Sequence, residues 1–103
     1  MRLLPKETEA IANVFRPYVE KSNLEVYLFG SRVNEHAKGG DIDLVTIGAS
    51  SDIEKIVEYK TKLLAQLFAV LGERKIDLSF ISRSDADTDV FWKNALMNKV
   101  KIL

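Results

Sequence analysis

The sequence predicts a small α/β domain in which helices pack on a mixed sheet of three or four strands. Segments with helical spacing of apolar residues take turns along the chain with short segments in which apolar and polar residues alternate singly. The chain has 103 residues, 47% of them hydrophobic and 29% charged, as in ordinary globular proteins. We therefore expect a single domain that spans residues 1–103.

The first expected helix covers residues 6–21, where apolar side chains recur on one helical face. Pro17 lies within this segment. Proline lacks a backbone donor and crowds the preceding turn, so we expect the helix to kink there or to end near Arg16.

The longest helix is expected from Ser51 to the stop signal at Gly72. Ser51 and Glu54 have the spacing of a capping box, which favours a start at Ser51. A shorter helix is expected over residues 90–98, after a polar connection at residues 82–89. The apolar stripe of the long helix consists of Ile53, Ile56, Val57, Leu63, Leu64, Leu67, Phe68 and Leu71.

Three strands are expected at residues 24–29, 41–47 and 75–81, and a short fourth strand can begin at Val100. The polar, glycine-rich residues 30–40 form a loop or a short helical turn between the first two strands. In the second strand, Ile42, Leu44 and Thr46 share one face and Asp41, Asp43, Val45 and Ile47 the other. In the third strand, Ile76, Leu78 and Phe80 oppose Asp77, Ser79 and Ile81.

Aspartates on the strands are the candidate chemical groups. Asp41 and Asp43 are two residues apart, so their carboxylates leave the same strand face with Cα atoms about 6.5 Å apart. Two ionised carboxylates on one face are costly unless water or a cation compensates them. Mg²⁺ prefers oxygen ligands, and Asp77 on the third strand could add a ligand or accept a proton. The pattern indicates a site for two Mg²⁺ ions.

A candidate anion site follows the first strand at Gly30, Ser31 and Arg32. Glycine permits close approach of a phosphate, and the amides of Ser31 and Arg32 with the serine hydroxyl can donate to it. The arginine could also remain a solvated loop charge. Gly30 alone would more simply be a strand terminator, and its pairing with Ser31 and the carboxylates favours a binding role.

The run Gly30-Ser31-Arg32, followed by Gly40-Asp41-Ile42-Asp43 and later by Asp77, resembles the signature of minimal nucleotidyltransferases of the DNA polymerase beta superfamily. The resemblance covers nearly the whole chain and implies a polymerase beta palm-like fold. It implies that Gly30 and Ser31 hold a nucleoside triphosphate, with ATP expected. It also implies that Asp41 and Asp43 bind two Mg²⁺ ions and that Asp77 completes the metal site and acts as base.

The implied reaction transfers a nucleoside monophosphate to an acceptor hydroxyl. The resemblance also suggests a HEPN-domain toxin as partner, with this chain as its antitoxin; a homo-oligomer is the other expected assembly. Many minimal nucleotidyltransferases carry Gly-Ser-x-Ala-Arg-Gly and a serine before the first aspartate. Here Val33-Asn34-Glu35 and Gly40 stand instead, so the substrate does not carry over. Two alternatives are an idle partner-binding module and a catalytic subunit that modifies a small molecule or tRNA.

Several features have simpler explanations as structure. Asp41 could be only a turn residue, and Asp77 could form a buried salt bridge with Arg74 or, less readily because neighbouring strand residues point to opposite faces, with Lys75. Phe91, Trp92 and Tyr59 could stack a base, although helix packing explains them first.

Charge and composition exclude other classes. Fifteen basic and fifteen acidic residues leave no net charge, which argues against general nucleic-acid binding, although a nucleic acid could still be an acceptor. The sequence has no cysteine, and hence no disulfide or thiolate metal site. It shows neither a signal-peptide apolar region nor a membrane span, so we expect a cytoplasmic protein without membrane contact.

Overall fold

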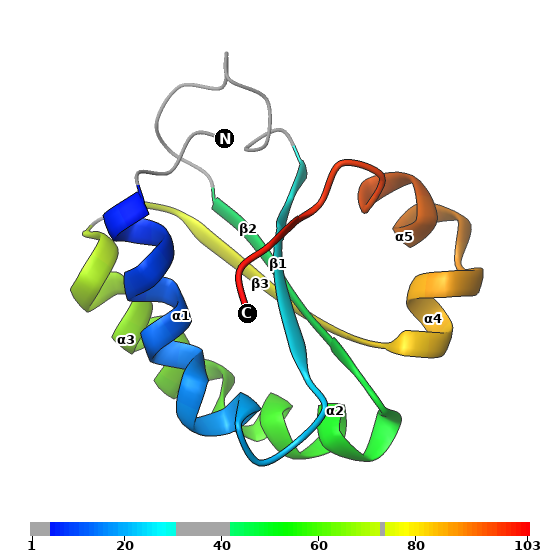
Figure 1. The fold of residues 1–103 in the computed structure, drawn as a ribbon, viewed down its shortest axis with the longest axis horizontal. Coiled ribbons are helices and arrows are strands. Elements are labelled where there is room, and N and C mark those ends of the chain that lie inside the picture. Colours follow the sequence, from blue (N-terminus) through cyan, green and yellow to red (C-terminus); the bar gives the residue numbers. More distant parts are fainter. Residues whose placement is uncertain (1–4, 31–41, 73) are drawn as a thin grey trace.

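The computed structural model describes residues 5–30, 42–72 and 74–103, which form a mixed four-stranded sheet with helices on both faces (Figure 1). The predicted fold class is therefore confirmed. The elements in chain order are α1 (Pro5–Val19), β1 (Glu25–Phe29), β2 (Ile42–Gly48), α2 (Ser50–Ile56), the 3-10 helix η2 (Val57–Tyr59), α3 (Lys60–Leu71), β3 (Ile76–Ser82), α4 (Arg83–Thr88), α5 (Val90–Ala95) and β4 (Val100–Lys101). None of the helices in these described ranges has the length and apolar character needed to cross a membrane.

The strand order is β3-β2-β1-β4. β1 pairs antiparallel with both β2 and β4, whereas β2 and β3 are parallel. Parallel neighbours need a crossover connection, which α2, η2 and α3 supply between β2 and β3. The parallel pair therefore lies at one side of the sheet, with β3 as its edge strand.

The two sheet faces carry two hydrophobic cores. In Figure 1, α1, α2 and α3 lie on one side of the sheet and α4 and α5 on the other. The larger core lies on the α1 and α3 side; it includes Ile11, Phe15, Leu28, Ile42, Leu44, Leu63, Leu67, Ile76 and Leu78. The smaller core lies on the α4 and α5 side and consists of Phe29, Val45, Ile47, Ile81 and Leu96. These sets confirm the predicted alternation of faces in β2 and β3.

Of the two outcomes expected at Pro17, a kink or an end near Arg16, the structure excludes the end, because α1 continues to Val19. The amide that proline lacks would have donated within the last turn, so a single hydrogen bond is lost close to the helix end. Helical hydrogen bonding continues past the proline, since Glu20 N donates to Arg16 O at 3.0 Å.

The long helix predicted from Ser51 is interrupted and begins one residue earlier. α2 starts at Ser50 with Ala49 as N-cap and no side-chain capping bond, so Ser51 is inside the helix and the expected capping box is absent. The tighter winding of η2 then rotates the helical face between α2 and α3. Val57 is consequently 44% exposed, and Phe68, at the border of the apolar stripe, is 45% exposed; neither belongs to the core.

Gly72 ends α3 as predicted, with a positive φ of 82°. The polar connection at residues 82–89, by contrast, contains a helix that the sequence had not indicated. Ser82 caps α4 by accepting a hydrogen bond from Asp85 N, and Asp89 caps α5 by accepting one from Trp92 N. The polar residues of this segment are thus helix caps as well as connecting residues.

A charged cluster joins α4 to two strands. Glu25 on β1 accepts hydrogen bonds from Arg83 of α4 at 3.0 Å and from Lys101 of β4 at 3.4 Å. Arg83 also donates to the carbonyl of Asn23 at 3.1 Å. The Arg83 hydrogen bond is the main reason that the pKa of Glu25 lies below its usual 4.5, and Lys101 lowers it further against the effect of burial.

The lowered pKa of Glu25 predicts a pH-dependent contribution to stability. Its stabilisation is present above the unfolded-state pKa of 4.5 and is lost as the pH falls through the lower folded-state value. Glu25→Gln should therefore reduce the free energy of unfolding at neutral pH, by a small amount because the pair is partly exposed. Urea unfolding at a series of pH values should show the difference from wild type shrinking below pH 4.5. Glu20→Gln, at an exposed position, is the control; a difference that grows on acidification would contradict the assignment.

Thr46 is the buried polar side chain of the sheet. It is 0% exposed in β2, and its hydroxyl has no hydrogen-bond partner among the described residues. A buried hydroxyl without a partner retains its desolvation cost.

Thr46→Val should therefore stabilise the protein, because valine fills the same space without a hydroxyl. We expect about 1 kcal/mol in the free energy of unfolding, measured by urea titration. Thr46→Ala, which leaves a cavity, should be destabilising and serves as the matched comparison. A loss of stability in the valine variant would show that the hydroxyl is hydrogen-bonded.

Candidate active site

Two of the three predicted carboxylates are neighbours on the sheet. Asp43 of β2 is in register with Asp77 of the parallel strand β3. The residues that flank each aspartate point into the larger core, so both carboxylates leave the opposite face, the one that carries α4 and α5. Adjacent strands are about 4.8 Å apart, which places the two acidic side chains beside each other.

The backbone fixes this arrangement at the start of both strands. Ile42 N, one residue before Asp43, donates to the carbonyl of Lys75, two residues before Asp77, at 2.9 Å. Asp77 is exposed to solvent and Asp43 is partly buried. The pair is therefore held by ladder hydrogen bonds and remains accessible from solvent through Asp77.

Gly30 lies against the Asp43 carboxylate. Phe29, the last residue of β1, pairs with Asp43, and Gly30 follows with a φ of 75°. A Cβ atom added to Gly30 would lie 2.7 Å from Asp43 Oδ2, closer than van der Waals contact permits. Glycine is needed here for its backbone conformation and for the space that the carboxylate occupies.

The structure thus brings together Gly30, Asp43 and Asp77. Ser31, Arg32 and Asp41, the other predicted site residues, lie outside the described residues. Within the ranges that are described, no group of three or more histidine, aspartate or glutamate side chains is arranged to hold a metal ion. The described residues therefore contribute two acidic side chains to the candidate site, Asp43 and Asp77.

The salt-bridge explanation for Asp77 finds no support. Arg74 forms its ion pair with Glu7 of α1. Among the described residues, Asp77 forms no ion pair with Arg74 or Lys75. An exposed carboxylate beside a second carboxylate is unfavourable for stability by itself, which favours a role in binding or catalysis.

The aromatic residues named from the sequence separate onto the two faces. Trp92 of α5 packs on Phe29 with ring centroids 5.5 Å apart, next to Asp43, and Phe91 contacts Trp92 edge-on at 5.1 Å. Tyr59 instead packs against Tyr18 of α1 at 5.2 Å. Packing explains Trp92 and Tyr59 in part, but Phe91 is 65% exposed.

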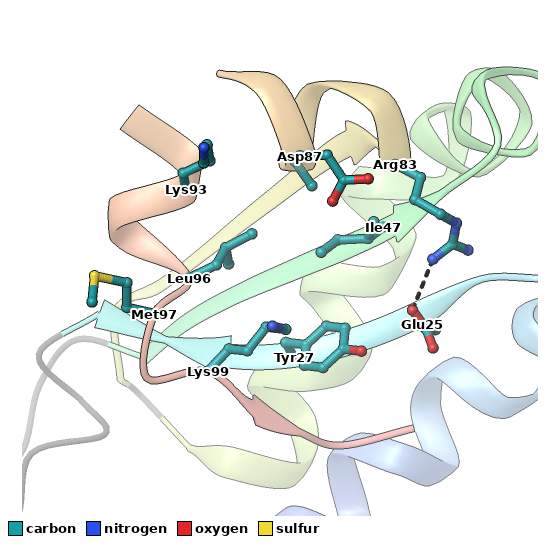
Figure 2. A pocket seen from close by; sticks show the side chains of 10 residues that line it. Glu25, Tyr27, Ile47, Arg83, Asp87, Lys93, Leu96, Met97 and Lys99 are labelled. Atoms are coloured by element: carbon teal, nitrogen blue, oxygen red, sulfur yellow. Dashed lines mark hydrogen bonds and ion pairs between the residues drawn. The ribbon is translucent and has the colours of Figure 1, made fainter. Parts of the chain in front are cut away.

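A cavity of about 450 Å³, which the sequence did not indicate, lies on the carboxylate face toward the opposite end of β1. Figure 2 shows Glu25, Tyr27, Arg83 and Lys99 in its lining, with the Glu25–Arg83 ion pair. Burial raises the pKa of Tyr27, and the Glu25 carboxylate raises it further. The smaller core occupies the same sheet face between this cavity and the aspartate pair, so the two are separate features.

Comparison with known families identifies the class of protein that this fold and site define. The family described as "Polymerase beta, Nucleotidyltransferase" matches residues 9–103. The chain belongs to the polymerase beta nucleotidyltransferase family, as the sequence motif had predicted. A comparison with curated proteins finds no match.

Two glycine variants test the contact between Gly30 and Asp43. Gly30→Ala should lower the free energy of unfolding by about 1–2 kcal/mol through its positive φ, and should also displace the Asp43 carboxylate. Gly72→Ala also places alanine at a positive φ, but nothing lies within 4 Å of its added Cβ. Urea unfolding together with Mn²⁺ titration should show weakened metal binding in Gly30→Ala alone. Equal metal affinity in the two variants would mean that Gly30 does not shape the site.

Proposed function

We propose that this protein is a Mg²⁺-dependent nucleotidyltransferase that moves a nucleoside monophosphate from a triphosphate, with ATP expected, to an acceptor hydroxyl. The observation that carries the proposal is the in-register pairing of Asp43 with Asp77 beside Gly30. Membership of the polymerase beta nucleotidyltransferase family supports the reaction class.

The donor chemistry of the pair fits magnesium. Two carboxylates on one sheet face repel each other, and a bound cation offsets that repulsion. Carboxylate oxygens are the ligands that Mg²⁺ prefers. Asp43 and Asp77, with Asp41 added from outside the described residues, would hold two ions. Bound there, Mg²⁺ would supply charge neutralisation for the phosphoryl group in transfer.

The protein groups have separate tasks in the proposed reaction. Gly30 leaves room for phosphate and carboxylate to approach, and Ser31 and Arg32 would donate hydrogen bonds to the triphosphate. A carboxylate oxygen of Asp77, which is open to solvent, would accept the proton of the acceptor hydroxyl. The acceptor oxygen then bonds to the α-phosphorus as the bond to pyrophosphate breaks. Much of the rate gain in such a transfer comes from holding the reactants in line.

The acceptor is proposed to lie on another molecule, and the expected protein partner is a HEPN-domain toxin with this chain as its antitoxin. The sequence resemblance suggests this partner, and the exposure of Asp77 is compatible with an acceptor that approaches from solvent. A labelling experiment distinguishes a protein acceptor from RNA or a small molecule. Incubation with Mg²⁺, an α-labelled nucleotide and host lysate, followed by separation of the three fractions, identifies where the label goes.

Aspartate variants test the catalytic assignment. Asp77→Asn should lower the transfer rate about 10²–10⁴-fold, because the amide cannot accept the proton as a carboxylate does. Asp43→Asn should be at least as damaging, since it removes a charged metal ligand. Asp77→Asn should not lower the melting temperature greatly, because it removes one charge at an exposed position beside a second carboxylate.

Asp87→Asn is the matched control, an exposed aspartate on α4 that lies away from the pair. It should transfer label at the wild-type rate. Full activity in Asp43→Asn would overturn the metal assignment. Absence of label from every fraction, together with no effect of Mg²⁺ and nucleotide on the melting temperature of the wild type, would favour an idle binding module.

A further inference from the structure

We propose that the base of the nucleotide stacks on the exposed ring of Phe91, which Trp92 supports edge-on, and that this aromatic platform gives the site a preference for purines. The inference rests on the proposed nucleotidyltransferase function and deepens it by naming the groups that recognise the base.

The first contact fixes α5 beside the site. Trp92 packs on Phe29 with the ring planes at 59°, and it contributes to the smaller core on the carboxylate face. Phe29 is the register partner of Asp43. One side chain therefore separates the indole from the strand position of a proposed metal ligand.

The second contact extends the aromatic surface outward. Phe91 meets Trp92 edge-on, with the ring planes at 84°. Phe91 is 65% exposed, so much of its ring remains open to solvent, and it is not a member of the smaller core beneath it. An aromatic face in water gains free energy when a flat heterocycle covers it.

The Phe91–Trp92 pair is better placed to contact a nucleotide than the Tyr18–Tyr59 pair is. The base of a nucleotide lies one sugar away from its α-phosphate. Trp92 contacts Phe29, the register partner of Asp43, and Phe91 lies one ring contact further out. Tyr18 and Tyr59 also form a ring contact, but Tyr18 packs against the larger core on the other face of the sheet. Tyr59 therefore cannot reach a nucleotide held at the aspartates.

Stacking also determines the kind of selectivity. Every base has an aromatic face, so stacking tolerates different bases, and its strength follows the size of the ring system. A platform without hydrogen-bond readout should therefore favour ATP and GTP over UTP and CTP by affinity, while accepting all four.

Trp92 is the only tryptophan in the chain, so its fluorescence reports on the platform directly. The wild-type protein, with Mg²⁺, is titrated with ATP, UTP and inorganic tripolyphosphate, which has no base. ATP should quench the fluorescence and bind more tightly than UTP. Tripolyphosphate, detected by its competition with ATP, should bind without quenching of its own.

Phe91→Ala should weaken ATP binding about tenfold, reduce the difference between ATP and UTP, and leave the affinity for tripolyphosphate unchanged. Phe91→Leu keeps an apolar side chain without a ring and should resemble the alanine variant. Val90→Ala is the matched control, since Val90 is 74% exposed on the same helix and has no aromatic face.

The outcomes separate this inference from the proposed function. If tripolyphosphate and ATP bind wild type equally well and Phe91→Ala changes neither affinity, the platform is overturned while the triphosphate site stands. If Phe91→Leu binds ATP like wild type, the contact is apolar and not stacking, which also overturns it. If neither ligand binds wild type, the proposed function fails and this inference with it.

Discussion

The parallel pairing of β2 with β3 is the constraint on which the rest of this structure depends. Its register places Asp43 beside Asp77, although the two residues are far apart in the sequence. A shift of one residue in either strand would turn its aspartate into the larger core and all of its core residues to the opposite face of the sheet. Ile42 and Ile76, which precede the aspartates and are both buried, therefore help to hold the acidic pair in place.

The two-sided core explains where the site can be. Helices cover both faces of the sheet, so a charged side chain on β2 or β3 is tolerated only where that cover ends. The smaller core fills the carboxylate face around Val45, Ile47 and Ile81, which lie two to four residues after the aspartates on the same strands. Asp43 and Asp77 occupy the positions before it, and Trp92 of α5 packs on Phe29, the register partner of Asp43. The apolar cluster thus both supports the aspartates and separates them from the cavity at Glu25 and Arg83.

Local sequence signals succeeded where one interaction dominates. The alternation of apolar residues gave the faces of β2 and β3 correctly, because a buried face tolerates few exceptions. Local signals predicted helices incorrectly where the sequence was compatible with more than one helix start. Ser51 can cap a helix, yet packing of the crossover begins α2 at Ser50, and the polar segment that holds α4 has caps but no apolar stripe. A short helix of that kind depends on its contacts with the sheet.

The sequence by itself determined the fold class, the family motif, and the strand faces that carry Asp43 and Asp77, since these follow from residue type and spacing. It did not determine which strands are neighbours. Only the tertiary structure decided that β2 and β3 pair in register, that Gly30 lies against Asp43, and that Trp92 packs on Phe29 whereas Tyr59 packs on Tyr18. The physical reason is that strand pairing and helix packing are set by contacts between distant segments, which a local pattern does not encode.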